Sequence, residues 1–117
     1  MNEVSWLLMG GAVVAFLMVR RIKGGTRVSP SEVLEKIKDG AKVVDVRSPG
    51  EYLTGAYPGA VNIPVQELDR RLSELPRDRP IVVYCASGGR SAAAQRLLNA
   101  RGFAQVINGG GLGDMPR

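Results

Sequence analysis

The only cysteine of the chain, Cys85, directly follows the most apolar segment, residues 81–84, and opens a loop of small residues. The loop residues are Ala86, Ser87, Gly88, Gly89, Arg90 and Ser91. A thiolate is the reactive form of cysteine, and a nearby cation and a helix N-terminus both favour it. Small residues let backbone N–H groups turn inward as a nest for an anion, while Arg90 adds a cation and Ser91 is placed to cap a following helix. The pattern predicts a nucleophilic cysteine in an anion-binding loop.

A purely structural role for Cys85 is the competing interpretation. Cysteines at strand ends are often buried as small apolar residues, and glycines often only form a turn. Here small residues, an arginine and the start of a helix all follow the cysteine directly. This combination favours the chemical role.

The composition excludes several kinds of chemistry. The chain has no histidine, which removes Ser-His-Asp and Cys-His catalysis and leaves no convincing zinc site. A single cysteine excludes an internal disulfide. We therefore expect neither a metal nor another cofactor.

The net charge of +5 raises the question of nucleic-acid binding. Four of the sixteen basic residues, Arg20, Arg21, Lys23 and Arg27, form one cluster beside an apolar stretch, and the others are scattered among acids. Aromatic residues, which stack on bases in many nucleic-acid sites, make up only 5% of the chain. We therefore expect no nucleic-acid partner.

The segments that must position the cysteine loop alternate between helix and strand patterns. Capping boxes at residues 29–32 and 48–51 predict the first two helix starts of the domain. The predicted helices cover residues 30–39, 49–54, 66–75 and 91–101, and the predicted strands cover residues 42–46, 60–64, 81–84 and 105–107. This alternation indicates an α/β domain with a parallel central sheet flanked by helices. Ligands bind such sheets beyond the carboxyl ends of the strands, where Cys85 stands.

An apolar stretch precedes this domain. Residues 4–22 carry charge only at Arg20 and Arg21, and as a helix they would be about 28 Å long, close to the hydrocarbon core of a bilayer. Trp6 would lie at one membrane–water interface, where an indole is favourable, and the side chains of Arg20 and Arg21 can extend to the other interface. A cleaved signal peptide would instead need basic residues before the stretch and small residues after it. A buried core helix would show an amphipathic face, which this stretch lacks.

We therefore expect residues 1–25 to form a transmembrane helix with a basic linker, and residues 26–117 to form a single domain. The basic cluster follows the span, so the positive-inside rule predicts a single-pass protein of the inner or cell membrane with its domain facing the cytoplasm. Gly11 and Ala15 form a small-xxx-small pair, through which two such helices could pack as a homodimer.

Two blocks of the sequence resemble the signatures of single-domain rhodaneses. One is the loop with its strand, residues 82–91 (VVYCASGGRS). The other is residues 44–52 (VDVRSPGEY), followed by Gly55 and residues 58–64 (PGAVNIP). An N-terminal anchor is similar to that of the membrane-associated bacterial members. The resemblance implies a rhodanese-like fold and a thiosulfate sulfurtransferase.

The same resemblance implies a role for each candidate site residue. Cys85 would take a sulfane sulfur from a donor such as thiosulfate, carry it as a persulfide and pass it to a thiol or cyanide. Arg90 and the amides of residues 86–91 would bind the donor and stabilise the persulfide. Asp45, Arg47 and Glu51 match family positions that organise the scaffold by ion pairing.

The chain departs from the family pattern at two places. Residues 55–57 (GAY) stand where the family often has Gly-His-Ile. The family commonly continues from a Gly-Gly stretch into a helix that contains aromatic residues, whereas residues 108–117 (NGGGLGDMPR) contain none. Whether the chain after Asn108 forms an ordered last element stays open at this point.

Two other functions compete with sulfur transfer. One class of cysteine phosphatases resembles rhodaneses in fold, but its loop between cysteine and arginine is one residue longer, and the shorter loop here suits a sulfur atom better than a phosphate. Arsenate reduction is disfavoured because no second cysteine can resolve an intermediate. A non-catalytic rhodanese-like module that senses or interacts at the membrane would usually lack the cysteine, so its presence favours catalysis.

Overall fold

The structure, a computed structural model, describes residues 28–117. The predicted transmembrane helix, its basic cluster and the Gly11–Ala15 pair all lie outside these residues. Within the part that the structure describes, no helix is both long and apolar enough to cross a bilayer.

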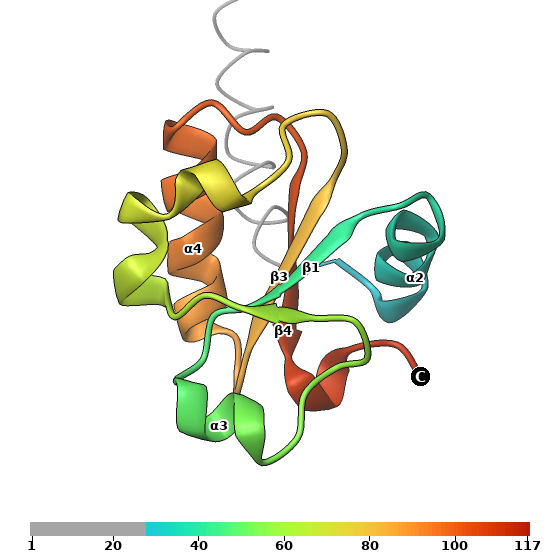
Figure 1. Cartoon of the computed structure of the whole chain (residues 1–117). Coiled ribbons are helices and arrows are strands. Elements are labelled where there is room, and N and C mark those ends of the chain that lie inside the picture. Colours follow the sequence, from blue (N-terminus) through green and yellow to red (C-terminus); the bar gives the residue numbers. More distant parts are fainter. Residues whose placement is uncertain (1–27) are drawn as a thin grey trace, which may run out of the picture.

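Four parallel strands form one sheet in the order β2-β1-β3-β4, and helices lie on both sides of it (Figure 1). The strands are β1 (Lys42–Asp45), β2 (Val61–Asn62), β3 (Ile81–Cys85) and β4 (Val106–Gly111). Strand β3 lies between two neighbours, and all five of its residues are buried, which explains its apolar sequence. The predicted α/β domain with a parallel sheet flanked by helices is confirmed.

The helices are α2 (Pro30–Lys38), α3 (Pro49–Leu53) and α4 (Gly89–Ala100), with 3-10 helices η1 (Val65–Arg70), η2 (Leu72–Glu74) and η3 (Leu112–Asp114). Both predicted helix starts are confirmed. Ser29 caps α2 by accepting a hydrogen bond from the amide of Glu32, and Ser48 and Glu51 form a complete reciprocal capping box on α3.

Two apolar clusters form the core, one on each face of the sheet. Because side chains alternate along a strand, Val82 and Tyr84 pack on the face of α2, while Val83 and Cys85 pack on the face of α4. The fold therefore directs the thiol toward the helix that follows it in sequence.

The predicted helix over residues 66–75 is wrong in type. The segment forms the two 3-10 helices η1 and η2, and Arg71 between them leaves the helical conformation at φ −121° and ψ 23°. Leu68 and Leu75 are still buried in the core on the α4 face. A 3-10 helix rises about 2.0 Å per residue instead of 1.5 Å, so the segment reaches further along the sheet on its way back to β3.

The last element is ordered and longer than residues 105–107. Strand β4 runs to Gly111, η3 follows it, and Met115 is buried against the α2 face. A Cβ atom on Gly109 would lie 2.6 Å from the Met115 sulfur, so the glycine leaves the space that Met115 fills. Glycines in sequence usually indicate a turn, and here they permit close packing instead.

Candidate active site

Cys85 is the last residue of β3 and lies at the carboxyl end of the sheet, as predicted for a ligand-binding position. The residue is 1% exposed. The amide of Gly88 donates a hydrogen bond to the sulfur at 3.0 Å, and the hydroxyl oxygen of Ser91 lies 3.5 Å from the sulfur. The thiol is thus held in a polar loop although it belongs to an apolar strand.

The loop after Cys85 turns tightly at Gly88. Gly88 has φ +109°, a left-handed conformation that glycine adopts without strain, and it directly precedes the first helical residue, Gly89. Ala86, Ser87 and Gly89 are exposed at the mouth of the loop. The N-terminus of α4, with its partial positive charge, therefore begins next to the sulfur.

Ser91 does not cap α4 as expected, because Gly88 occupies the cap position. Ser91 is instead the third helical residue and fully buried, and its hydroxyl donates to Oδ1 of Asn108 at 2.7 Å. A serine hydroxyl has one hydrogen and two lone pairs, so while it serves Asn108 it can accept from the Cys85 thiol. Once the sulfur is a thiolate, the same hydrogen can turn toward it.

These contacts set the ionisation of the cysteine. Burial raises the pKa of the Cys85 thiol, but hydrogen bonds from the Ser91 hydroxyl and from the amides of Ser91, Gly88 and Ser87 lower it by more. The pKa of Cys85 therefore lies below that of an ordinary thiol. This is the direction that a nucleophilic cysteine requires.

The C-terminal strand contributes two site residues that the sequence interpretation missed. Asn108 is 3% exposed, and its Oδ1 accepts from both Ser91 and the amide of Gly110, at 2.7 and 2.9 Å. Gly111 is the register partner of Cys85, and a Cβ atom on it would lie 2.9 Å from the carbonyl carbon of Ala86. One local signal for Asn108 was available, namely a polar residue directly after the apolar pair of residues 106–107.

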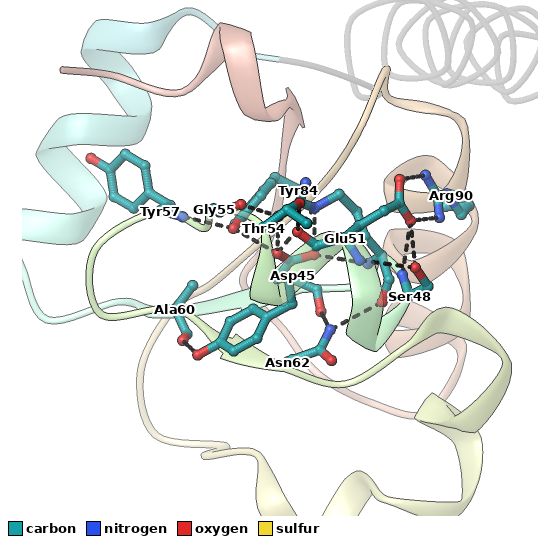
Figure 2. A network of polar contacts seen from close by, with 12 residues as sticks. Asp45, Ser48, Glu51, Thr54, Gly55, Tyr57, Ala60, Asn62, Tyr84 and Arg90 are labelled. Carbon is teal, nitrogen blue, oxygen red and sulfur yellow. Dashed lines mark hydrogen bonds and ion pairs between the residues drawn. The ribbon is translucent and has the colours of Figure 1, made fainter.

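Arg90 was expected to place its cation near the sulfur or a bound anion. Its guanidinium forms a two-pronged ion pair with Glu51, with Nη1–Oε1 at 2.7 Å and Nη2–Oε2 at 3.1 Å (Figure 2). The hydrogen bonds with Glu51 raise the pKa of Arg90 against the opposing effect of burial, and the charges of Glu51 and Cys85 add to that increase. Arg90 thus interacts electrostatically with Cys85 while its guanidinium is bound to the Glu51 carboxylate.

Glu51 connects two parts of the site. Its Oε1 accepts a hydrogen bond from the amide of Ser48 at 3.0 Å, and this bond is part of the capping box of α3. The same carboxylate binds Arg90 of α4. The hydrogen bonds from Arg90, and then those from the amide and hydroxyl of Ser48, lower the pKa of Glu51 to about 2. Glu51 is therefore ionised at neutral pH and links helix α3 to the cysteine loop.

Asp45 and Arg47 form a separate buried ion pair at the end of β1, with Nη2–Oδ2 at 2.7 Å. Arg47 also donates to the carbonyl of Gly55, and the Tyr84 hydroxyl donates to Asp45 at 2.8 Å (Figure 2). The pKa of Tyr84 is raised to about 12, mainly by burial. The hydrogen bond from the amide of Tyr57 opposes this increase, and the hydrogen bond to Asp45 adds to it. The contacts join β1, β3 and the chain before β2, in keeping with a scaffold role.

A cavity of about 460 Å³ lies between residues 56–58 and the C-terminal residues, beside Met115. None of the cysteine-loop residues lines it. It is therefore distinct from the site around Cys85.

Comparison with known proteins places this geometry in a family. The sequence profile of the family described as "Rhodanese-like domain" matches residues 29–111. A sulfurtransferase of Allochromatium vinosum is 41% identical over 66 residues, covering 56% of this chain and 62% of that protein. Thiosulfate sulfurtransferase PspE of Escherichia coli is 36% identical over 74 residues, covering 62% of this chain and 71% of that protein.

Solved structures agree with the sequence comparison. The human single domain sulfurtransferase TSTD1 superimposes with a TM-score of 0.65 at 30% identity, covering 73% of this chain and 88% of that one. The matched region spans less than two thirds of several curated relatives, for example 62% of the A. vinosum protein and 16% of a tRNA sulfurtransferase of Desulfurococcus amylolyticus. These relatives support sulfur transfer as the general class of activity. Because the matched profile covers both the β1–α3 block and the cysteine loop, the chain belongs to the rhodanese-like domain family.

Proposed function

We propose that this protein is a thiosulfate sulfurtransferase-like enzyme, which moves a sulfane sulfur from a donor such as thiosulfate to a thiol or cyanide through a persulfide on Cys85. The observation that carries the proposal is the environment of the sulfur. A buried thiol accepts a hydrogen bond from the Gly88 amide at 3.0 Å, directly before the N-terminus of α4. A backbone donor and a helix N-terminus both favour negative charge on that sulfur.

In the first half-reaction, the Cys85 thiolate attacks the outer sulfur of thiosulfate. A new S–S bond forms to Cys85, the S–S bond of thiosulfate breaks, and sulfite leaves with its electron pair. The product is a persulfide anion on Cys85, and the total charge is unchanged. The amides that lower the pKa of the thiol would stabilise the outer sulfur of the persulfide in the same way.

In the second half-reaction, cyanide or a thiolate attacks the outer sulfur of the persulfide. The bond to Cys85 breaks, the sulfur leaves as thiocyanate or as the persulfide of the acceptor, and the Cys85 thiolate is regenerated. The chain has no second cysteine. The persulfide therefore cannot collapse into an internal disulfide and persists until an external acceptor reaches it.

We also propose that residues 4–22 anchor the protein in the membrane and that its domain faces the cytoplasm. The support is the sequence alone: an apolar stretch of bilayer length that is uncharged over residues 4–19, with a basic cluster at and after its end. A reporter fused after Arg117 should behave as cytoplasmic and fractionate with membranes. An exported reporter, or one that stays in the soluble fraction, would contradict the proposal.

Intact-protein mass spectrometry after thiosulfate treatment tests the proposed reaction. We expect the protein to gain the mass of one sulfur atom, and a reductant or cyanide to remove it. A protein that never gains a reducible sulfur with any sulfane donor would instead be the non-catalytic module. Turnover of aryl phosphates without sulfur loading would favour the phosphatase alternative.

A further inference from the structure

The cation that the cysteine loop offers to an anionic donor is already neutralised. Arg90 uses both terminal nitrogens of its guanidinium to bind Glu51, at 2.7 and 3.1 Å. The side chains are 40% and 36% exposed, so the pair stands where solvent and a small donor can reach it. A donor that approaches the site meets a neutral pair instead of a free cation.

The Glu51 carboxylate that neutralises Arg90 is also held in place by a second residue. The carboxylate is fixed from the other side by the amide and the hydroxyl of Ser48, each at 3.0 Å from Oε1. The carboxylate therefore does not depend on Arg90 for its place. Because it is held by the cap of α3, it stays at the mouth of the site when Arg90 turns toward a ligand.

The charge of the donor decides how strongly Glu51 affects it. Repulsion from a fixed carboxylate scales with the charge of the approaching anion, so a dianion such as thiosulfate is disfavoured about twice as strongly as a monoanion. Thiosulfate would also compete with Glu51 for the two-pronged face of Arg90. A donor with one negative charge is repelled less by Glu51 than a dianion is. It therefore depends less on breaking the Glu51–Arg90 pair in order to bind.

We propose that Glu51 is a specificity-determining residue, which acts through Arg90 and biases donor use toward sulfane donors with a single negative charge and against dianions. The inference rests on the sulfurtransferase function proposed above. It assigns Glu51 a role in donor selection beyond its place in the scaffold. Glu51 does not contact the reacting sulfur in this role, so it is a positioning residue.

The test uses two donors that differ in charge but little in shape, thiosulfate and methanethiosulfonate. In the second donor a methyl group replaces one charged oxygen, and methanesulfinate leaves instead of sulfite. With the full chain, kcat/KM for each donor is measured at low ionic strength by thiocyanate formation from cyanide. In a two-step transfer this quantity reports only the donor half-reaction, so the acceptor does not affect the comparison.

The informative variant is Glu51→Gln. Glutamine still accepts from Ser48 in the capping box, so α3 keeps its start while the negative charge is lost. We expect the ratio of kcat/KM for thiosulfate to kcat/KM for methanethiosulfonate to rise about three- to tenfold, the order expected for one screened charge at the mouth of a site. The increase should shrink at high salt, a response that a purely structural role would not produce.

Glu74→Gln is the matched control. Glu74 of η2 also binds an arginine at two nitrogens, Nε and Nη2 of Arg71 at 2.7 and 2.9 Å, but η2 leads to the amino end of β3. This variant should leave the donor ratio unchanged. The double variant E51Q/R90Q, in which both charges are absent, should return the ratio toward that of the wild type.

Two kinds of failure are distinguishable. If both donors load Cys85 and Glu51→Gln leaves the ratio within twofold of the wild type, or lowers it, the role of Glu51 is refuted and sulfur transfer stands. If neither donor loads wild-type Cys85, the sulfurtransferase function itself fails. Should Glu51→Gln not fold, Arg90→Gln tests the same charge effect, because it leaves the Glu51 carboxylate unbalanced. Its donor ratio should lie below that of the wild type and rise at high salt, and a ratio that salt does not change would refute the role of Glu51.

Discussion

Gly111 of β4 is the register partner of Cys85, and its backbone lies against the first residues of the cysteine loop. The register between β3 and β4 shifts between Val83 and Cys85, so the two strands meet irregularly just where the loop begins. Asn108 of the same strand holds the Ser91 hydroxyl beside the sulfur. The C-terminal strand is therefore a wall of the candidate active site.

Gly111→Ala should damage the site more than the fold. The added Cβ would meet the backbone of Ala86, which cannot move away as a flexible side chain could, so the loop must shift. We expect sulfur transfer to fall at least tenfold, with a loss of about 1–3 kcal/mol in the free energy of unfolding. Gly113→Ala is the control, because nothing lies within 4 Å of its added Cβ. Equal activity in the two variants would refute the contact.

Cys85→Ser should abolish transfer and keep the fold. The side-chain volume is nearly the same, but a serine hydroxyl is a poor nucleophile without a general base, and the chain has no histidine. The variant should gain no sulfur from thiosulfate and form no thiocyanate, while its circular dichroism spectrum stays that of the wild type. Residual conversion of thiosulfate and cyanide to thiocyanate would show that the nucleophile lies elsewhere.

Ser91→Ala should raise the pKa of Cys85. In the wild type, burial raises the pKa of Cys85, but several hydrogen bonds lower it by more, and the bond from the Ser91 hydroxyl is the largest of these. Without that hydroxyl, the pKa of Cys85 should lie closer to that of an ordinary thiol. Alkylation of the wild type by iodoacetamide should therefore reach half its maximal rate at a lower pH than in the variant. Ser73→Ala, an exposed serine of η2, is the control. Coincident pH profiles would remove Ser91 from the ionisation of Cys85.

The same shift has a consequence for stability. Because the pKa of Cys85 is lowered in the folded state, the thiolate stabilises the fold at pH values above the pKa of the unfolded thiol. This contribution is lost as the pH falls through the folded pKa. The free energy of unfolding of Cys85→Ser should lack this component, which a comparison of urea denaturation curves across that pH range would reveal.

Arg90→Ala should cut thiosulfate-dependent transfer by more than tenfold. The change removes the cation that the donor needs and leaves the Glu51 carboxylate, still held by Ser48, as an unbalanced negative charge at the site. Stability should change little, because the pair is half-exposed. Arg71→Ala, which breaks two ion pairs, one with Glu67 of η1 and one with Glu74 of η2, is the control for activity. Transfer within twofold of the wild type would show that the donor binds without Arg90.

The sequence by itself determined the alternation of helices and strands and the position of the cysteine. These features depend on local signals that act within one turn or one strand. Ser29 and Ser48 cap their helices because the acceptor and the amide it serves are three residues apart. Cys85 follows the most apolar strand, and the end of a parallel strand lies where ligands bind whatever the details of packing.

Local sequence signals did not predict the secondary structure correctly where the same residues are compatible with two conformations. Residues 109–111 are typical of a turn, because glycine costs a strand both entropy and packing. The fold uses them as strand because a side chain on Gly109 would collide with Met115, and one on Gly111 with the cysteine loop. The leucines at positions 68, 72 and 75 have α-helical spacing, yet the segment forms two 3-10 helices and still buries Leu68 and Leu75 in the core.

Only the tertiary structure decided which charges pair beside the cysteine loop and which hydroxyl lies near the sulfur. Arg90 is paired with Glu51, 39 residues earlier, and Ser91 with Asn108, 17 residues later. No spacing rule connects such positions, since they become neighbours only when β1, β3 and β4 align in one sheet. Coulombic attraction and hydrogen bonding act over a few ångströms, so the partner of a charge follows from the strand order and not from the residues beside it.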